Sequence, residues 1–313
     1  MTPLLFSLPK DHALFTPLCK GLPAIEGGLE FRRFPDGESY LRVCSDIEPG
    51  QPVIILADLS RPDARFLPLY FLCDTLKELG AGQVGLLAPY LCYMRQDTRF
   101  HPGEAVTSRS FAHLLSHRFD WLLTVDPHLH RYHALSDIYT IPATTVHATP
   151  LLVDWLRARS EPLLLVGPDA ESEQWVSALA QASGHPFVVG SKQRRGDRDV
   201  HIRLPDLSGY HRHIAIMVDD VISSGQTLLR CARALTDAGI ERIEAAAIHG
   251  LFADRIEDQL QNAGVQRLIT TNSVSHPSNG LDLTPLLLEP LRQLARLADN
   301  RPPTPDNQAG ADI

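Results

Sequence analysis

The sequence predicts an α/β protein of two tandem domains, each a mainly parallel sheet flanked by helices. Short runs rich in Val, Ile and Leu alternate with longer segments of helical period along most of the chain, as in parallel sheets covered on both faces. The segments 53–90 and 214–250 share the order strand, acidic loop, helix, glycine and strand, which indicates duplication of one domain. A chain of 313 residues also suits two domains better than one.

The strands and helices follow from this alternation. In the first half we expect strands at 53–58, 84–89 and 121–126, and helices at 64–79 and 107–117. In the second half we expect strands at 163–166, 214–220, 243–249 and 266–271, and helices at 171–183, 226–238, 255–263 and 285–297. Pro and Thr interrupt both periods near 142–149, so the domains are predicted at 1–147 and 148–300. The tail at 301–313 contains three prolines and almost no bulky apolar residues, so it is expected to be disordered.

Composition excludes several classes of protein. Asp and Glu outnumber Lys and Arg by 37 to 29, so the overall field repels a polyanion and nucleic acid is not an expected partner. No segment approaches the roughly 18 apolar residues of a membrane span, and the first ten residues do not resemble a signal peptide. The five cysteines are scattered without a CxxC pair, which predicts reduced thiols in a cytoplasmic protein.

The most informative segment is IAIMVDDVISSGQT at 214–227, an apolar run that leads into Asp219-Asp220 and a loop of small residues. Backbone N–H groups at a helix start, freed of side-chain bulk by Gly225, can surround a phosphate dianion. The two carboxylates can then accept hydrogen bonds from sugar hydroxyls. The alternative is an ordinary strand-to-helix turn with acidic caps, which an acidic pair alone would not exclude.

This segment resembles the phosphoribosyl-binding loop of the type I phosphoribosyltransferases and of their relatives, the ribose-phosphate pyrophosphokinases. The resemblance implies two phosphoribosyltransferase-type domains. It also implies that ribose 5-phosphate is bound by Asp219, Asp220, Ser223, Ser224, Gly225, Gln226 and Thr227. The corresponding loop of the first half, at 58–64, has neither the glycine nor the acidic pair, so only the second domain is expected to hold the ribose phosphate.

Further segments between residues 33 and 271 resemble ribose-phosphate pyrophosphokinases in the same order. RFPDGE at 33–38 is similar to an element that, in the family, reaches from a neighbouring subunit to the base and ribose of ATP. YMRQD at 93–97 is similar to the Arg-Gln-Asp element of the nucleotide-contacting loop. The resemblance thus implies a homo-oligomer, either a dimer or a hexamer, with these ATP-binding residues: Phe34, Asp36, Glu38, Arg95, Gln96, Asp97 and Arg99.

Two segments resemble the metal-linked elements of the family. TVDPH at 124–128 matches the segment whose histidine, here His128, helps hold the Mg²⁺ of MgATP, and GPD at 167–169 matches the element whose aspartate, here Asp169, lies near the second metal. A surface cluster or a fortuitous zinc site formed by His128, His130 and His133 is the alternative. Beyond Asp169 the family usually has paired glycines, whereas this chain has Glu171 and Glu173.

SKQRRGD at 191–197 resembles the flexible catalytic loop of the family, with Lys192 and Arg194 as its Lys-x-Arg pair. A mobile basic loop suits phosphoryl transfer, because transition-state charge must be met by aimed donors in a site that reopens for product release. The alternative is a solvated basic turn.

Together these resemblances imply a ribose-phosphate pyrophosphokinase that uses Mg²⁺ and transfers the β,γ-diphosphoryl group of ATP to O1 of ribose 5-phosphate, giving phosphoribosyl pyrophosphate and AMP. Two other functions stay open. A nucleobase phosphoribosyltransferase would use the same loop, but it needs neither a duplicated domain nor the ATP elements. A non-catalytic regulatory homologue would fit the glutamates at 171 and 173, whereas the retained Lys192, Arg194, His128 and Asp169 speak against it.

Overall fold

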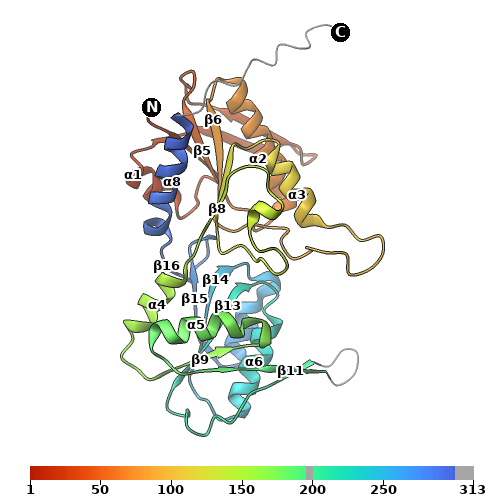
Figure 1. The fold of residues 1–313 in the computed structure, drawn as a ribbon, viewed down its shortest axis with the longest axis vertical. Helices are drawn as coiled ribbons and strands as arrows, with labels where there is room; N and C mark the ends of the chain where they lie inside the picture. The colour runs from red at the N-terminus through yellow and green to blue at the C-terminus, as the bar shows by residue number, and fades with distance from the viewer. Residues whose placement is uncertain (195–199, 300–313) are drawn as a thin grey trace.

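The computed structural model describes residues 1–194 and 200–299, so the tail predicted to be disordered at 301–313 lies outside the described residues (Figure 1). Two α/β domains follow one another along the long axis of the molecule (Figure 1). Each is built around a parallel sheet of six strands. The predicted fold class is confirmed.

The first sheet is flanked by the helices of the first half. Its strands, in spatial order, are β2 (Ile25–Glu26), β1 (Leu4–Leu8), β5 (Pro52–Ala57), β6 (Gln83–Ala88), β7 (Trp121–Val125) and β8 (Ala143–Val146). The helices are α1 (Phe15–Gly21), α2 (Pro62–Glu78) and α3 (Thr107–Ser116), with a 3₁₀ turn at Leu135–Asp137. Every residue of β5 and β6 is buried, which explains why residues 52–57 and 84–88 form continuous apolar runs in the sequence.

The second sheet repeats the arrangement of the first. Its strands, in spatial order, are β10 (Phe187–Val189), β9 (Leu163–Gly167), β13 (Ile214–Ile222), β14 (Ile243–Gly250), β15 (Val265–Thr271) and β16 (Asn279–Leu281). The helices are α5 (Glu173–Ser183), α6 (Gln226–Asp237) and α7 (Ile256–Asn262), with 3₁₀ turns at Ala170–Ser172 and Ala253–Arg255.

A β-hairpin is inserted at the same place in both domains, between the edge strand and the third strand of the sheet. In the first domain it consists of β3 (Leu29–Arg33) and β4 (Ser39–Val43), and in the second of β11 (Ser191–Arg194) and β12 (Val200–Arg203). The sequence analysis did not find these strands, because they stand away from the sheets and contain no continuous buried run. The matching insertions extend the evidence for duplication from sequence to topology.

Two helices tie the domains together. Helix α4 (Thr149–Arg157) packs against α5 in the second domain, whereas α8 (Thr284–Asp299), although last in the chain, packs against α1 in the first (Figure 1). Arg292 of α8 donates a hydrogen bond of 2.8 Å to the carbonyl of Gly21. One hydrophobic cluster accordingly contains residues of both sheets and both helices. The domain boundary at 147 falls between β8 and α4 and stays a prediction.

Two further features concern the chain's environment. None of the helices in the described parts of the chain combines the length and apolar character needed to cross a bilayer. All five cysteines lie among the described residues and all are free thiols, four of them buried. Burial raises the pKa of the Cys73 and Cys231 thiols to about 12, which keeps them protonated and unreactive.

Candidate active site

The carboxyl ends of the two sheets face each other across a cleft between the domains. A cavity of about 470 Å³ in this cleft is lined by Asp126 and His128 from the first domain and by Asp169, Lys192 and Asp219 from the second, among others. Loops at the carboxyl ends of parallel strands are the usual location of ligand sites in open α/β sheets. The duplication has therefore placed two such edges opposite each other.

The predicted phosphate loop forms a second, smaller pocket of about 190 Å³ beside the cleft, lined by residues 221–228 together with Asp219 and Arg95. Helix α6 begins at Gln226, directly after Gly225, so its free backbone N–H groups point into the pocket region. Gly225 adopts φ +61°, and a Cβ built on it would lie 2.2 Å from Cγ1 of Ile256. Glycine is thus required here both for conformation and for space.

The acidic pair lies on the neighbouring strand. We expected the strand to end at Asp219-Asp220, but β13 continues to Ile222, because Val221 and Ile222 pair with His249 and Gly250 of β14. Burial and the charge of Asp220 raise the pKa of Asp219 to about 8. Burial acts in the same direction on Asp220, but hydrogen bonding from His128 outweighs it and lowers the pKa of Asp220. These opposite shifts favour a proton on Asp219 and a charge on Asp220, so the pair can offer both a donor and an acceptor to vicinal hydroxyls.

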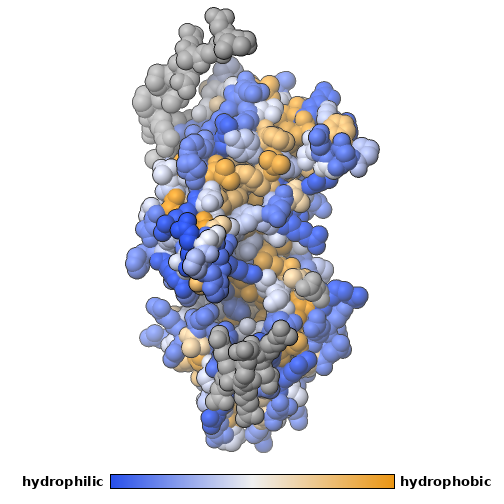
Figure 2. All heavy atoms as spheres, turned by 90° about the vertical axis from the view of Figure 1, so that its right-hand side faces the viewer, coloured by the Kyte–Doolittle hydropathy of each residue, from blue (hydrophilic) through white to orange (hydrophobic). Residues whose placement is uncertain are grey.

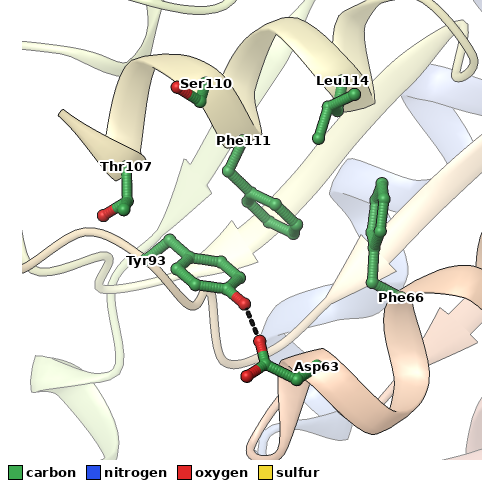
Figure 3. Close-up of a pocket in the computed structure, with 7 residues that line it drawn as sticks. All are labelled: Asp63, Phe66, Tyr93, Thr107, Ser110, Phe111 and Leu114. Atoms are coloured by element: carbon green, nitrogen blue, oxygen red, sulfur yellow. Dashed lines mark hydrogen bonds between the residues drawn. The ribbon is translucent and has the colours of Figure 1, made fainter. Parts of the chain in front are cut away.

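Arg95 links the two domains at the phosphate loop. Its Nη1 donates a hydrogen bond of 3.1 Å to Oγ of Ser223. The segment that carries Arg95 is anchored by Tyr93, which has the left-handed φ of +60° that non-glycine residues rarely adopt. Figure 3 shows the Tyr93 ring beneath Phe111, in a pocket of about 340 Å³ between α2 and α3, with its hydroxyl donating to Asp63. Tyr93 was not predicted as a site residue, because only its backbone conformation shows that it anchors the segment with Arg95.

The other predicted ATP residues after Arg95 hold the loop in shape. Asp97 is buried, and its Oδ1 accepts a 2.7 Å hydrogen bond from Arg131, a residue that sequence analysis missed. The carbonyl of Gln96 accepts hydrogen bonds from Ser108. The Nε of Arg99 donates a 2.9 Å hydrogen bond to a backbone carbonyl, that of Glu104. Contact of these residues with ATP stays a prediction.

Phe34, Asp36 and Glu38 lie at the turn of the β3–β4 hairpin and are exposed. Arg32 stacks over the Phe34 ring with 4.6 Å between its guanidinium carbon and the ring centroid, and Arg33 donates a 2.6 Å hydrogen bond to the carbonyl of Ala64 at the start of α2. These three residues are not among those that line the two pockets of the cleft. The structure therefore presents an outward-facing hairpin on the first domain.

His128 and Asp169, the predicted metal-linked residues, face the same cavity from opposite domains. Nδ1 of His128 lies 2.5 Å from Oδ2 of Asp220, a hydrogen bond that raises the pKa of His128. Oδ2 of Asp169 lies 2.6 Å from Nζ of Lys192. In the described part of the chain, no group of three or more His, Cys, Asp or Glu side chains is arranged to hold a metal ion.

This donor set fits Mg²⁺ bound together with substrate phosphates. Mg²⁺ usually keeps several waters and takes one or two protein carboxylates plus phosphate oxygens, rather than a complete cage of protein ligands. Asp169 supplies a carboxylate at the cavity wall, and the imidazole of His128 supplies a further donor. A zinc site formed by His128, His130 and His133 receives no support, because these side chains, all in the described part of the chain, do not form a group that could hold a metal ion.

The glutamates that depart from the family pattern differ in position. Glu171 lines the cavity, whereas Glu173 is exposed in the first turn of α5. Asp169 caps the 3₁₀ turn that leads into this segment by accepting a hydrogen bond of 3.0 Å from the N–H of Glu171. One additional carboxylate, that of Glu171, therefore reaches the cleft.

The segment 191–197, predicted as the catalytic loop, begins as strand β11 of the β11–β12 hairpin. Lys192 is on strand β11, paired with Ile202 of β12, rather than in a loop. Antiparallel pairing explains the difference, because the basic segment is the first arm of a hairpin. The side chain of Arg194 and residues 195–199 lie outside the described residues.

The counterpart of the phosphate loop in the first domain lacks the features of an anion site. Arg65 of α2 forms an ion pair with the buried carboxylate of Asp58, at the end of β5. Burial tends to raise the pKa of Asp58, but hydrogen bonds from Ser60 and Arg65 outweigh it and lower that pKa. The arginine near this helix start is thus paired with a carboxylate of the same loop. That only the second domain holds ribose phosphate stays a prediction.

We predict that Gly225→Ala weakens binding of ribose 5-phosphate, measured by isothermal titration calorimetry. Forcing alanine into a left-handed φ costs about 1–2 kcal/mol, and here the methyl group also collides with Ile256. Gly184→Ala is the matched control, because Gly184 has φ +78° at the end of α5 with nothing within 4 Å of its built Cβ. Equal affinities in the two variants would contradict the role assigned to the loop.

Two family models match this chain. The one described as the N-terminal domain of ribose phosphate pyrophosphokinase matches residues 4–118. The one described as a phosphoribosyl transferase domain matches residues 134–282. Together they cover the strands of both sheets except β7, which lies in the interval between the two matches.

Curated relatives and a solved structure agree with these matches. A ribose-phosphate pyrophosphokinase from Methanopyrus kandleri is 32% identical over 281 residues, covering 89% of this chain and 94% of the relative. One from Sulfolobus acidocaldarius is 30% identical over 251 residues, covering 79% and 84%. The crystal structure of phosphoribosylpyrophosphate synthetase from Mycobacterium smegmatis has the same fold, with a TM-score of 0.81 at 22% identity over 95% of this chain and 100% of that one. On the sequence matches, this chain belongs to the ribose-phosphate pyrophosphokinase family of enzymes.

Proposed function

We propose that this chain transfers the β,γ-diphosphoryl group of ATP to O1 of ribose 5-phosphate, giving phosphoribosyl pyrophosphate and AMP. The observation that carries the proposal is the cleft itself. An anion loop with an acidic pair on the second domain faces Arg95 and His128 of the first, with 3.1 Å between Arg95 and Ser223. A pentose phosphate and a triphosphate can meet in this cleft.

Ribose 5-phosphate is oriented by the second domain. Its phosphate binds the N–H groups and hydroxyls of 223–227, and its ring hydroxyls contact Asp219 and Asp220. The ring then points from the loop toward the cavity lined by His128, Asp169 and Lys192. The 1-hydroxyl is thereby directed at the side of the cleft where the first domain presents ATP.

The reaction needs alignment and charge neutralisation more than covalent help from the protein. O1 attacks the β-phosphorus, the bond from that phosphorus to the oxygen of AMP breaks, and the hydroxyl proton passes to solvent. Lys192 and Arg95 lie where they can meet charge on the transferring group, and Arg194 is assigned the same role by resemblance. Asp169, which lines the cavity, pairs with Lys192, so this ammonium is directed into the cleft.

Mg²⁺ is the proposed cofactor, with Asp169 and His128 as the residues that would hold it. When bound, it neutralises charge on the triphosphate. The ion pair of Lys192 with Asp169 and the hydrogen bond of His128 to Asp220 orient both metal-linked side chains toward the cavity. The free thiols fit the cytoplasmic location expected from the sequence.

We also propose that the active form is a homo-oligomer in which the β3–β4 hairpin of one subunit completes the ATP site of another. Phe34, Asp36 and Glu38 extend outward and do not line the two pockets of their own cleft. The same domain exposes large apolar side chains on α2 and α3, which include Leu67, Phe71 and Leu114. Figure 2 shows hydrophobic surface in the upper half of the molecule. Exposed apolar patches of this kind mark protein contact surfaces.

We predict that Lys192→Ala lowers turnover by about 10²-fold to 10³-fold, because one donor to the transition-state charge is lost. The assay resolves AMP formed from ATP, ribose 5-phosphate and Mg²⁺, with no nucleobase present. Lys20→Ala, a change of an exposed lysine on α1, is the control and should retain wild-type turnover. AMP release by Lys192→Ala at the wild-type rate would remove Lys192 from the mechanism. Nucleotide binding without AMP release by the wild-type protein would favour a regulatory homologue instead.

Shared sites predict complementation between two inactive variants. Phe34→Ala damages the hairpin, Lys192→Ala damages the cleft, and in a mixed dimer both changes fall in one site while the other site is intact. Co-refolding the variants in equal amounts should restore about a quarter of the wild-type activity, because half of randomly formed dimers are mixed. Refolding each variant alone is the control. A mixture no more active than its components would contradict a site built by two subunits.

A further inference from the structure

We propose that His249 is a positioning residue that locks the carboxyl end of β14 in the second domain to the carboxyl end of β7 in the first, and so aligns the two substrates. The inference rests on the proposed function. His249 lies outside the substrate-binding segments at 93–99 and 219–227. It is buried, and its hydrogen bonds join the two domains that carry these segments.

The imidazole of His249 is only 1% exposed, and both of its nitrogens are used. Nε2 lies 3.1 Å from the carbonyl oxygen of Val125 and 3.3 Å from that of Asp126, both in the first domain. Nδ1 lies 2.9 Å from Oγ of Ser273 in the second domain. Because carbonyl oxygens only accept, Nε2 must carry the hydrogen and Nδ1 then accepts from the serine hydroxyl. Burial lowers the pKa of His249, which agrees with this neutral form.

The segment that His249 holds leads directly to the cleft. Asp126 has a left-handed φ of +33°, a conformation that persists only where surrounding contacts fix it. Its carboxylate accepts a 2.7 Å hydrogen bond from the N–H of Ala148, and its carbonyl faces His249. Two residues later, His128 reaches Asp220 across the cleft at 2.5 Å.

These contacts join the same two stretches of the two domains at more than one point. In β13 and β14, Val221 pairs with His249, so Asp220 lies beside His249 on the neighbouring strand. The second domain therefore holds residues 125–128 at two points, the backbone through His249 and the side chain of His128 through Asp220. Tyr90, which follows β6, packs edge-on against the His249 ring with centroids 5.1 Å apart. The imidazole is thus enclosed by first-domain atoms on two sides.

This junction controls alignment because the two substrates are held by different domains. The loop at 223–227 moves with the second sheet, and the Arg95 segment moves with the first. A shift of about 1 Å between nucleophile and electrophile can cost about 100-fold in rate, even when the responsible change is remote from the chemistry. Loss of the His249 contacts should therefore lower kcat, while each half-site keeps its own substrate affinity.

The test compares His249→Leu, which keeps bulk but no polar atoms, with His249→Gln, whose amide can still donate to Val125. We expect His249→Leu to lower kcat by about 10-fold to 100-fold. The KM values for ATP and ribose 5-phosphate should each stay within about threefold of wild type. His249→Gln should recover most of the lost kcat. Steady-state AMP release is measured well below each variant's unfolding temperature.

Two other variants separate positioning from stability. Leu76→Ala truncates a fully buried side chain of α2 that does not line the cleft. This change should lower the unfolding temperature without changing kcat. If His249→Leu does not fold, Ser273→Ala is the substitute. It removes the partner of Nδ1, and kcat should fall by about 2-fold to 10-fold with KM unchanged.

Wild-type kcat in His249→Leu, a rise in KM alone, or a glutamine variant as impaired as the leucine variant would each overturn the proposal. Loss of kcat in Leu76→Ala equal to that in His249→Leu would do the same, since stability alone would then explain both. Absence of AMP release by the wild-type protein would instead overturn the proposed function, so the two failures are distinguishable.

Discussion

The carboxyl ends of two parallel sheets oppose each other, and each other feature of the cleft depends on that opposition. Helix starts and strand-end loops carry free N–H groups and exposed side chains, so one such edge already makes a binding site. Two opposed edges make a site for two ligands. In this chain the opposition is fixed by the shared hydrophobic cluster, by α8 crossing to the first domain, and by hydrogen bonds across the cleft.

Duplication supplied the two edges, and substitution then made them different. The loop after β13 keeps Gly225 and the acidic pair, while the loop after β5 has Arg65 paired with Asp58 in a position where an anion would otherwise bind. The inserted hairpins diverged in the same way. The hairpin of the second domain carries Lys192 toward its own cleft, whereas that of the first turns Phe34 and its neighbours outward. The hairpin inserted at this topological position thus supplies a lysine to the cleft in the second domain. In the first domain it supplies, as proposed, an intersubunit contact.

Much of this arrangement could be predicted from the sequence, because the signals are local. The fully buried strand β5 forms an unbroken apolar run, and the buried strands β6 and β14 are apolar apart from Gln83, Glu244 and His249. The small-residue loop with Gly225 reflects a left-handed backbone conformation that other residues rarely adopt. Strands β3 and β4 could not be found in this way, since their side chains are exposed or only half-buried. In β12, the buried Ile202 lies between exposed His201 and Arg203, which is too short a pattern to indicate a strand. Helix α8 was predicted as a helix, but its packing on the first domain depends on a contact between Arg292 and Gly21 that no local pattern shows.

Long-range contacts also explain why the site residues were only partly anticipated. Asp97 was identified from a motif as a ligand residue, while the structure buries it against Arg131. Tyr93 acts through its left-handed backbone conformation, and His249 acts through hydrogen bonds to the other domain. Neither property can be inferred from residue type or spacing. The residue types that form the site could therefore be predicted from the sequence. The contacts that hold those residues in place could not.

A crystal structure with ribose 5-phosphate, Mg²⁺ and a non-hydrolysable ATP analogue bound together would test the central claim most directly. The expected result is the sugar phosphate on the amides of 224–227, the triphosphate along the Arg95 segment, and O1 in line with the β-phosphorus within the cavity lined by His128 and Lys192. A ribose phosphate bound outside the 223–227 loop, or a triphosphate held apart from the cleft, would contradict it.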